Sequence, residues 1–260
     1  MLEPPAFAPR LLPENRVMQS LWVGDALGDM ELLSIRSFLA HGHTYHLYLY
    51  DDCPNVPPGV IIKDAHAILP PTWRGYITLP SFADEFRYNL LPKSGIPWWV
   101  DLDIIALAPF NTEQPYCFAS ENYPPERPTT LVNTCVIKAP PDCAFLHHAI
   151  RRTATMDPAH PKGRYLNGII AYGPELATEL VFELALERFI APAATFIPIA
   201  SCDTPRAFID PTIPTDLTHS LAVHCFKSCW GEGPQPSHHP NSLWEQLKRR
   251  YPSNMELSYA

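Results

Sequence analysis

The sequence predicts a single α/β domain, in which a mixed, mainly parallel twisted sheet is flanked by helices. Three observations predict it. The chain has 260 residues, enough to bury a large core in one domain. Short β-branched and aromatic runs alternate with longer segments of helical apolar periodicity. No internal repeat or flexible linker divides the chain, and its 31 prolines gather in connections between these segments. Such alternation is typical of strands that are linked through helices.

The first half of the chain is expected to begin as strand, helix, strand, strand. The strands are expected over 20–23, 45–50 and 60–63, with a helix between the first two that stops near Gly42. A second helix over 79–91 has a defined start, because Ser81 and Asp84 have the spacing of a capping box.

The second half is expected to add strands and three helices. A buried strand ends at Asp101, a continuation follows a break, and further strands are expected over 117–120, 131–140 and 219–224. The expected helices cover 141–154, 174–189 (with Pro174 in its first turn) and 241–251.

The stretch PWWVDLDIIALAPF (97–110) places two aspartates, Asp101 and Asp103, inside an apolar run. A buried carboxylate is unfavourable unless it has a partner. Side chains alternate along a strand, so both carboxylates are expected on one face, toward the crevice at the carboxyl ends of the strands. Two oxygen ligands suit Mg²⁺ or Mn²⁺. One alternative is that the two aspartates merely terminate the strand. Another is an aspartate-nucleophile phosphotransferase, whose D-x-D lies near the N-terminus with a threonine close behind, unlike here.

Composition limits the classes of binding partner and the cellular compartment that the sequence predicts. The formal charge of −8 argues against nucleic acid, which needs clustered basic residues. Seven scattered cysteines indicate free thiols in a reducing compartment, and no second ligand pair at zinc spacing accompanies His224, Cys225 and Cys229. No apolar run approaches the roughly 18 residues of a membrane span. We therefore expect a cytoplasmic protein, with at most peripheral contact at the inner face of a membrane through the basic helix at the C-terminal end.

Several blocks in order resemble the D-x-D sugar-nucleotide glycosyltransferases. This group includes the sugar transferases of capsule and lipopolysaccharide biosynthesis and the α-1,4-galactosyltransferases, with the clostridial glucosylating toxins more distant. The matching blocks are SLWVG, YHLYLYDD, SFADEFRYNLL, WWVDLDIIAL and HCFKSCW, with the weaker LVNTCVIKAP and YGPEL, from about Leu21 to Trp230. Ile96 and Pro97 stand where the family often has two glycines, and Tyr172 replaces a threonine.

The resemblance implies a glycosyltransferase-A fold and a set of site residues. The nucleotide-binding part of the single domain (1–260) would cover about 17–110, and the acceptor-binding and closing part about 111–260. Trp22 would stack on the uracil of a UDP-sugar donor. Asp84, Arg87 and Asn133 would hydrogen-bond the donor.

The same resemblance implies the ligands of the cation. Asp103 would bind Mn²⁺ or Mg²⁺ directly, and Asp101 would orient the ribose or metal-bound water. His224 or Ser228 would complete the metal shell, and the Trp230 indole N–H would donate to the β-phosphate. Structural alternatives stay open: a capping role for Asp84, an intrahelical pair for Arg87, a core position for Trp22 and a strand-end role for His224 and Asn133.

The predicted activity is transfer of a hexose from a UDP-sugar to the hydroxyl of a glycan or lipid-linked glycan, with retention at the anomeric carbon. No residue stands out as a catalytic base, which is compatible with retention. Three alternatives remain: a glycosyltransferase that modifies a protein, a non-catalytic module that binds nucleotide-sugars, and a structural or interaction protein.

Overall fold

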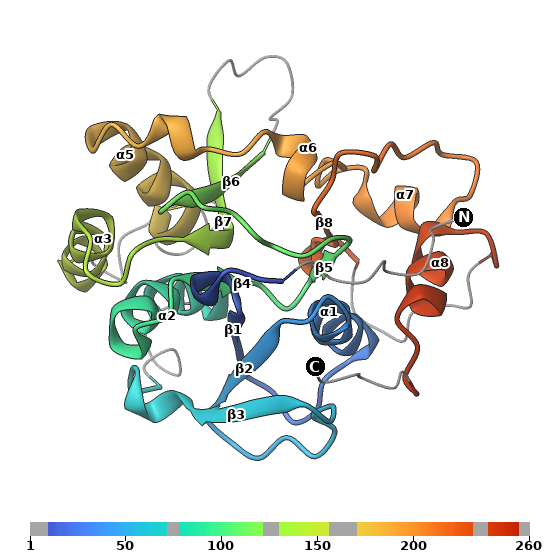
Figure 1. Ribbon diagram of the computed structural model, residues 1–260, viewed down its shortest axis with the longest axis horizontal. Coiled ribbons are helices and arrows are strands. Elements are labelled where there is room, and N and C mark those ends of the chain that lie inside the picture. The colour runs from blue at the N-terminus through green and yellow to red at the C-terminus, as the bar shows by residue number, and fades with distance from the viewer. Residues whose placement is uncertain (1–9, 72–77, 122–129, 156–170, 231–238, 255–260) are drawn as a thin grey trace.

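The computed structural model of the protein describes residues 10–71, 78–121, 130–155, 171–230 and 239–254 (Figure 1). Its helices and strands form a mixed α/β domain, as the sequence predicts. Among the helices in these ranges, none is long and apolar enough to cross a membrane.

The N-terminal part is a parallel sheet with one helix against it. Strands β1 (Val17–Trp22), β2 (Thr44–Leu49) and β3 (Val60–Asp64) pair in the order β1-β2-β3, all parallel. Helix α1 (Asp29–Ala40) connects β1 to β2. Gly42 follows the helix with φ 80°, a left-handed conformation that glycine adopts without strain. All four elements were predicted; the strand ends differ by up to three residues, and α1 begins five residues after the start of the predicted helical stretch.

The remaining strands pair antiparallel. Strand β7 (Leu131–Lys138) lies between β4 (Trp98–Val100) and β6 (Cys117–Glu121), and β5 (Ile104–Ala106) pairs with β8 (Ala222–His224). The expected predominance of parallel pairing therefore holds for β1–β3 alone within the described ranges. A hydrophobic run predicts a strand but not its direction, which depends on how the chain returns to the sheet.

The parallel and antiparallel parts meet where β1 lies beside β4 (Figure 1). The Ser20 hydroxyl donates to the Val100 carbonyl at 2.5 Å, and the Gln19 amide donates to the Trp98 carbonyl at 3.1 Å. Strand β4 is buried on both faces, because Trp99 packs into one apolar cluster and Trp98 and Val100 into another. The turn that follows β4 thus starts from a fixed position in the core.

Helix α2 (Leu79–Ser94) begins two residues before Ser81. Its N-terminal cap is Thr78, whose hydroxyl accepts a bond of 3.4 Å from the Ser81 N–H. The predicted capping box of Ser81 and Asp84 is therefore wrong. Asp84 lies one turn further along, where its carboxylate is free to face β7.

The other helices lie mainly in the second half of the chain. Helices α3 (Ala144–Thr155) and α8 (Leu243–Arg250) agree with the prediction. The helix expected over 174–189 is shorter: a π-helical turn (Ala171–Glu175) leads into α5 (Leu176–Glu183), which ends before the left-handed Ala185. Two short helices were not predicted, α6 (Ala193–Phe196) and α7 (Thr204–Ile209).

Candidate active site

Asp101 and Asp103 lie in the turn between β4 and β5, not within a strand. The Ile104 N–H donates to the Asp101 carbonyl at 3.2 Å and closes the turn. The Asp101 N–H donates to the carbonyl of Cys135 on β7, and the Asp103 carbonyl accepts from the N–H of Cys225, both at 2.8 Å. The two carboxylates were predicted to share a face through strand alternation. The turn brings them together instead, and a different segment holds the backbone of each.

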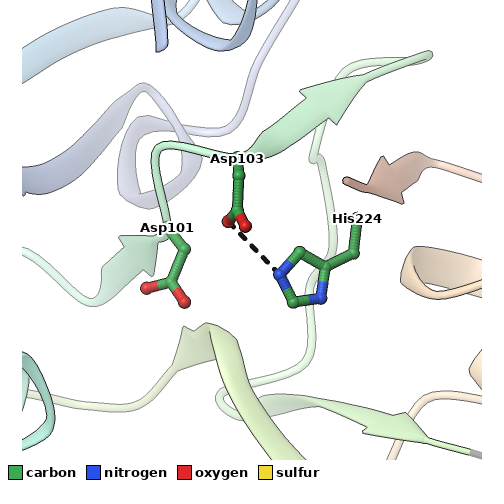
Figure 2. Close-up of side chains that lie close together, drawn as sticks. All are labelled: Asp101, Asp103 and His224. Atoms are coloured by element: carbon green, nitrogen blue, oxygen red, sulfur yellow. Dashed lines mark ion pairs between the residues drawn. The ribbon is translucent and has the colours of Figure 1, made fainter. Parts of the chain in front are cut away.

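The two carboxylates meet His224, the last residue of β8 (Figure 2). One ligand atom from each of Asp101, Asp103 and His224 can be chosen so that all three lie within 4.8 Å of one another. His224 Nε2 lies 3.2 Å from Asp103 Oδ1. Asp103 Oδ2 accepts a bond of 2.9 Å from the backbone N–H of Lys227. The resemblance predicted Asp103 with His224 or Ser228 around the cation and Asp101 close by, and the structure places Asp101, Asp103 and His224 together.

Burial and neighbouring charges perturb all three groups. Burial raises the pKa of Asp101, although the charge of Arg87 opposes it. For Asp103, burial acts upward, but the charge and hydrogen bond of His224 prevail and lower the pKa. For His224, burial acts downward, yet the charge of Asp103 raises the pKa well above its ordinary value. The pair of Asp103 and His224 is therefore ionised, and Asp101 binds a proton more readily than a free aspartate.

Arg87, on α2, joins the site to the helix layer. Its guanidinium lies 3.2 Å from the carboxylate of Asp101 and 3.3 Å from that of Asp84. The side chains of Arg87 and Asp84, both on α2, are about 5 % exposed. The guanidinium also lies over the ring of Trp99, 4.9 Å from its centroid. The Trp99 indole N–H donates to the same Asp101 oxygen at 2.8 Å. Arg87 therefore forms a bridge between two carboxylates. The intrahelical pair with Asp84 is one of these contacts, and the pair with Asp101 is the other.

Asp84 is buried behind this bridge. Thr134 on β7 donates its hydroxyl proton to Asp84 at 2.8 Å, and burial raises the pKa of Asp84 to about 6. Gly173 packs against the carboxylate so closely that a Cβ there would lie 2.6 Å from Oδ1. A side chain at position 173 is therefore sterically excluded. The predicted contact of Asp84 with sugar hydroxyls stays a prediction, and in this structure its contacts are with Thr134, Arg87 and Gly173.

Trp22 lies at the end of β1 beneath Lys227. The ammonium of Lys227 is 4.8 Å from the centroid of the Trp22 ring and 2.5 Å from the buried carboxylate of Glu31. The indole N–H of Trp22 is buried and has no hydrogen-bond partner in the described part of the chain. Stacking on a base stays a prediction for Trp22, and the lysine that covers its ring had no sequence signal beyond its place in HCFKSCW.

The remaining predicted residues lie around this centre. The Trp230 indole N–H donates to the Cys225 carbonyl at 2.6 Å, so donation to a phosphate would require that this bond be given up. Ser228 is exposed in the short turn Lys227–Cys229. Asn133 on β7 is buried, and its amide donates to the carboxylate of Glu121.

Sequence reasoning missed Glu121, Thr134 and Trp99. Glu121 contacts Asn133 and Thr134 contacts Asp84, 12 and 50 residues away, whereas Trp99 contacts Asp101 two residues away in the same block. Glu121 ends β6, and burial raises its pKa. The only sequence signal for it was its position at the end of a strand on the side of the sheet where a ligand is expected.

The residues present fit a divalent cation. Two carboxylates and one imidazole are a donor set that suits Mn²⁺ or Mg²⁺ better than a soft metal. His224 Nε2 faces Asp103 at 3.2 Å and is the ring nitrogen that could ligate the ion, whereas Nδ1 is buried and points away from both carboxylates (Figure 2). Asp101, Asp103 and His224 would hold the ion, and His224 would lose its proton on binding it, because a ligating imidazole is neutral.

The comparisons with known proteins give a distant likeness. No protein-family model matches the chain, and no curated protein matches it significantly. Among solved structures it is similar to one described as PaToxG glycosyltransferase, with 13 % sequence identity and a TM-score of 0.44 over 65 % of this chain and 69 % of that chain. A likeness of this extent carries no weight for activity, so the function is argued from the site.

Proposed function

We propose that the protein is a hexosyltransferase that uses a divalent cation, Mn²⁺ or Mg²⁺, to move a hexose from a UDP-sugar to an acceptor hydroxyl group. The observation that carries this proposal is the convergence of Asp101, Asp103 and His224 at the edge of the sheet, with ligand atoms within 4.8 Å of one another. A cation bound there would neutralise the negative charge that develops on the departing diphosphate.

The site has the chemistry that a sugar nucleotide requires. Asp103 carries a lowered pKa and is therefore ionised at neutral pH, as a cation ligand must be. Arg87 fixes the orientation of Asp101 from below through the bond of 3.2 Å. Trp22 lies at the end of the neighbouring strand, and a base would stack on its ring by displacing the Lys227 ammonium that now lies over it.

The finer assignments follow from the resemblance. Retention at the anomeric carbon is the expected stereochemistry, and the anomeric coupling constant of the product would measure it. The acceptor is a hydroxyl of a glycan, a lipid-linked glycan or a protein side chain. Mass shifts on candidate proteins separate the last possibility from glycan synthesis.

The first experiment is calorimetric titration of UDP into the protein, with and without Mn²⁺. The wild-type protein should bind UDP in the presence of Mn²⁺ and much more weakly without it. Asp103→Asn should weaken binding more than about 100-fold, since even outer-shell partners of a metal ligand contribute about 10–100-fold.

The matched control is Asp142→Asn. Asp142 also pairs with a histidine, His147, at 3.1 Å, but its side chain is 95 % exposed. This variant should bind as the wild type does. Equal binding by Asp103→Asn, or binding that does not depend on Mn²⁺, would contradict the proposed site. Binding of UDP without release of UDP from any UDP-hexose would indicate a non-catalytic module.

A further inference from the structure

Glu121 is a further carboxylate beside the site, outside the group that would hold the cation. It is the last residue of β6, and its side chain is partly buried. Asn133, across the ladder on β7, donates its amide proton to Oε1 of Glu121. The orientation of that amide is itself fixed, because its oxygen accepts a bond of 2.8 Å from the Cys135 N–H.

A chain of hydrogen bonds connects Glu121 to the cation ligands. From Glu121 it passes through the Asn133 side chain to the Cys135 N–H, and the Cys135 carbonyl then accepts from the Asp101 N–H at 2.8 Å. Glu121 and Asp101 therefore lie on opposite sides of strand β7, and hydrogen bonds link each of them to it. The charge of His224 also acts on Glu121, which places the carboxylate within electrostatic reach of the same centre.

The chemistry of Glu121 suits proton transfer. Asn133 is bonded to Oε1, so Oε2 is the oxygen that can receive a substrate hydroxyl. Burial raises the pKa of the carboxyl group above that of a free glutamate. A carboxylate of higher pKa is a stronger base, and general bases of this kind contribute about 10²–10⁴-fold to a rate.

We propose that Glu121 is the general base that accepts the proton of the attacking acceptor hydroxyl, and that Asn133 positions it. This inference rests on the proposed function. In the step, the acceptor oxygen approaches on the face of the sugar from which UDP departs, so that configuration is retained, and it forms a bond to the anomeric carbon while the bond from that carbon to the β-phosphate oxygen breaks. The electron pair of the broken bond stays with UDP, and the hydroxyl proton goes to Oε2 of Glu121. Asn133 then acts through Glu121 rather than on the donor sugar.

The test uses the full chain with Mn²⁺, UDP-glucose or UDP-galactose as donor, and two nucleophiles, water and azide. Release of UDP is measured for the wild type, Glu121→Gln and a control, Glu85→Gln. Glu85 lies on α2, and burial raises its pKa as well, but it has no part in the site. Azide carries no proton, so it needs no base.

Glu121→Gln should bind UDP with Mn²⁺ as the wild type does, and should release UDP to water about 10²–10⁴-fold more slowly. Azide should restore its rate to that of the wild type with azide, which a purely structural role would not produce. Asn133→Ala should show a smaller loss of the same kind, and Glu85→Gln none.

Each other outcome decides the matter. Hydrolysis by Glu121→Gln at the wild-type rate, or a loss that azide does not restore while UDP binding is intact, would overturn the role of Glu121. If the wild type itself does not bind UDP with Mn²⁺, or binds it and releases none from either donor, the proposed function fails first and the base assignment falls with it.

Discussion

Two groups of buried or partly buried polar side chains meet at β4, and they differ in charge. Beside β1 lies a neutral network that serves the backbone, consisting of Gln19, Ser20, Ser34, Ser37, His43 and Tyr45. Beside β7 lies a charged group of five ionisable side chains: Asp84, Arg87, Asp101, Asp103 and His224.

The difference separates a structural role from a functional one. In the neutral network most hydroxyl and amide groups bond to a backbone carbonyl or N–H group, and the Tyr45 hydroxyl bonds to that of Ser20. Ser34 donates to the Ile104 carbonyl at 2.6 Å, and Ser37 accepts from the Ala106 N–H at 2.8 Å, so α1 completes the free edge of β5. The fold could be completed with neutral groups. Buried ions add little net stability over apolar residues, so their concentration at one place is a reason to infer a function there.

The largest expected effect comes from removing the central charge of the second group. Arg87→Met leaves the buried Asp84 and the partly buried Asp101 without their shared partner. Loss of one member of a buried pair typically lowers the free energy of unfolding by about 3–5 kcal/mol. Urea denaturation at neutral pH would measure it.

The surface arginine Arg152 provides the matched control. It pairs with Glu179 at 3.2 Å and Glu183 at 2.6 Å, but both carboxylates are largely exposed. Arg152→Met should therefore lower the free energy of unfolding by no more than about 1 kcal/mol. Equal losses in the two variants would mean that the Arg87 bridge is no different from a surface pair.

Acid should act on the two groups with opposite sign. His43 is held neutral, since its Nδ1 bonds to the Asn15 carbonyl and its Nε2 accepts from the Phe110 N–H. Burial lowers its pKa to about 4, from an ordinary value of about 6.5. Between these values the unfolded chain binds more protons. The contribution of His43 to stability is therefore lost as the pH falls from 6.5 to 4, by up to about 3 kcal/mol.

Asp84 should respond the other way. Burial raises its pKa to about 6 from an ordinary 3.8. Between these values the folded chain binds more protons, so acidification relieves the cost of burying the charge.

Urea denaturation at pH 7 and pH 5 would compare His43→Gln and Asp84→Asn with the wild type. The first variant should gain relative stability at pH 5, and the second should lose it. Differences that do not change between the two pH values would contradict both assignments.

The smallest expected effect is in the neutral network. Ser34→Ala leaves the buried Ile104 carbonyl without its partner, which should lower the free energy of unfolding by about 1–3 kcal/mol. Thr155→Ala removes a similar hydroxyl bond from the exposed end of α3 and should change stability by no more than about 0.5 kcal/mol. If the two variants are equally stable, the neutral network does not secure β5.

The sequence predicted the elements better than their arrangement. Continuous apolar runs located the strands on either side of the D-x-D, because a strand that is buried on both faces has apolar residues at every position. The D-x-D and HCFKSCW blocks also predicted that Asp101, Asp103 and His224 belong together. The antiparallel direction of β6 to β8 left no local trace. The sequence did not predict the cap of α2 at Thr78, six residues before Asp84, and the contacts of Arg87 with Asp101 and of Glu121 with Asn133 depend on tertiary packing.

The backbone N–H of Lys227 and the carboxylate of Asp103 are 124 residues apart in the sequence. In polymer terms their hydrogen bond closes a long loop that contains β5, β6, β7 and most of the helices. Closure entropy grows slowly with length, by about 0.6 kcal/mol for each doubling, so a loop of this size is little harder to close than one half as long. A cut anywhere inside the loop turns this contact into one between two separate chains. Assembly of the site would then depend on the concentration of the two fragments, although no residue of the site had changed.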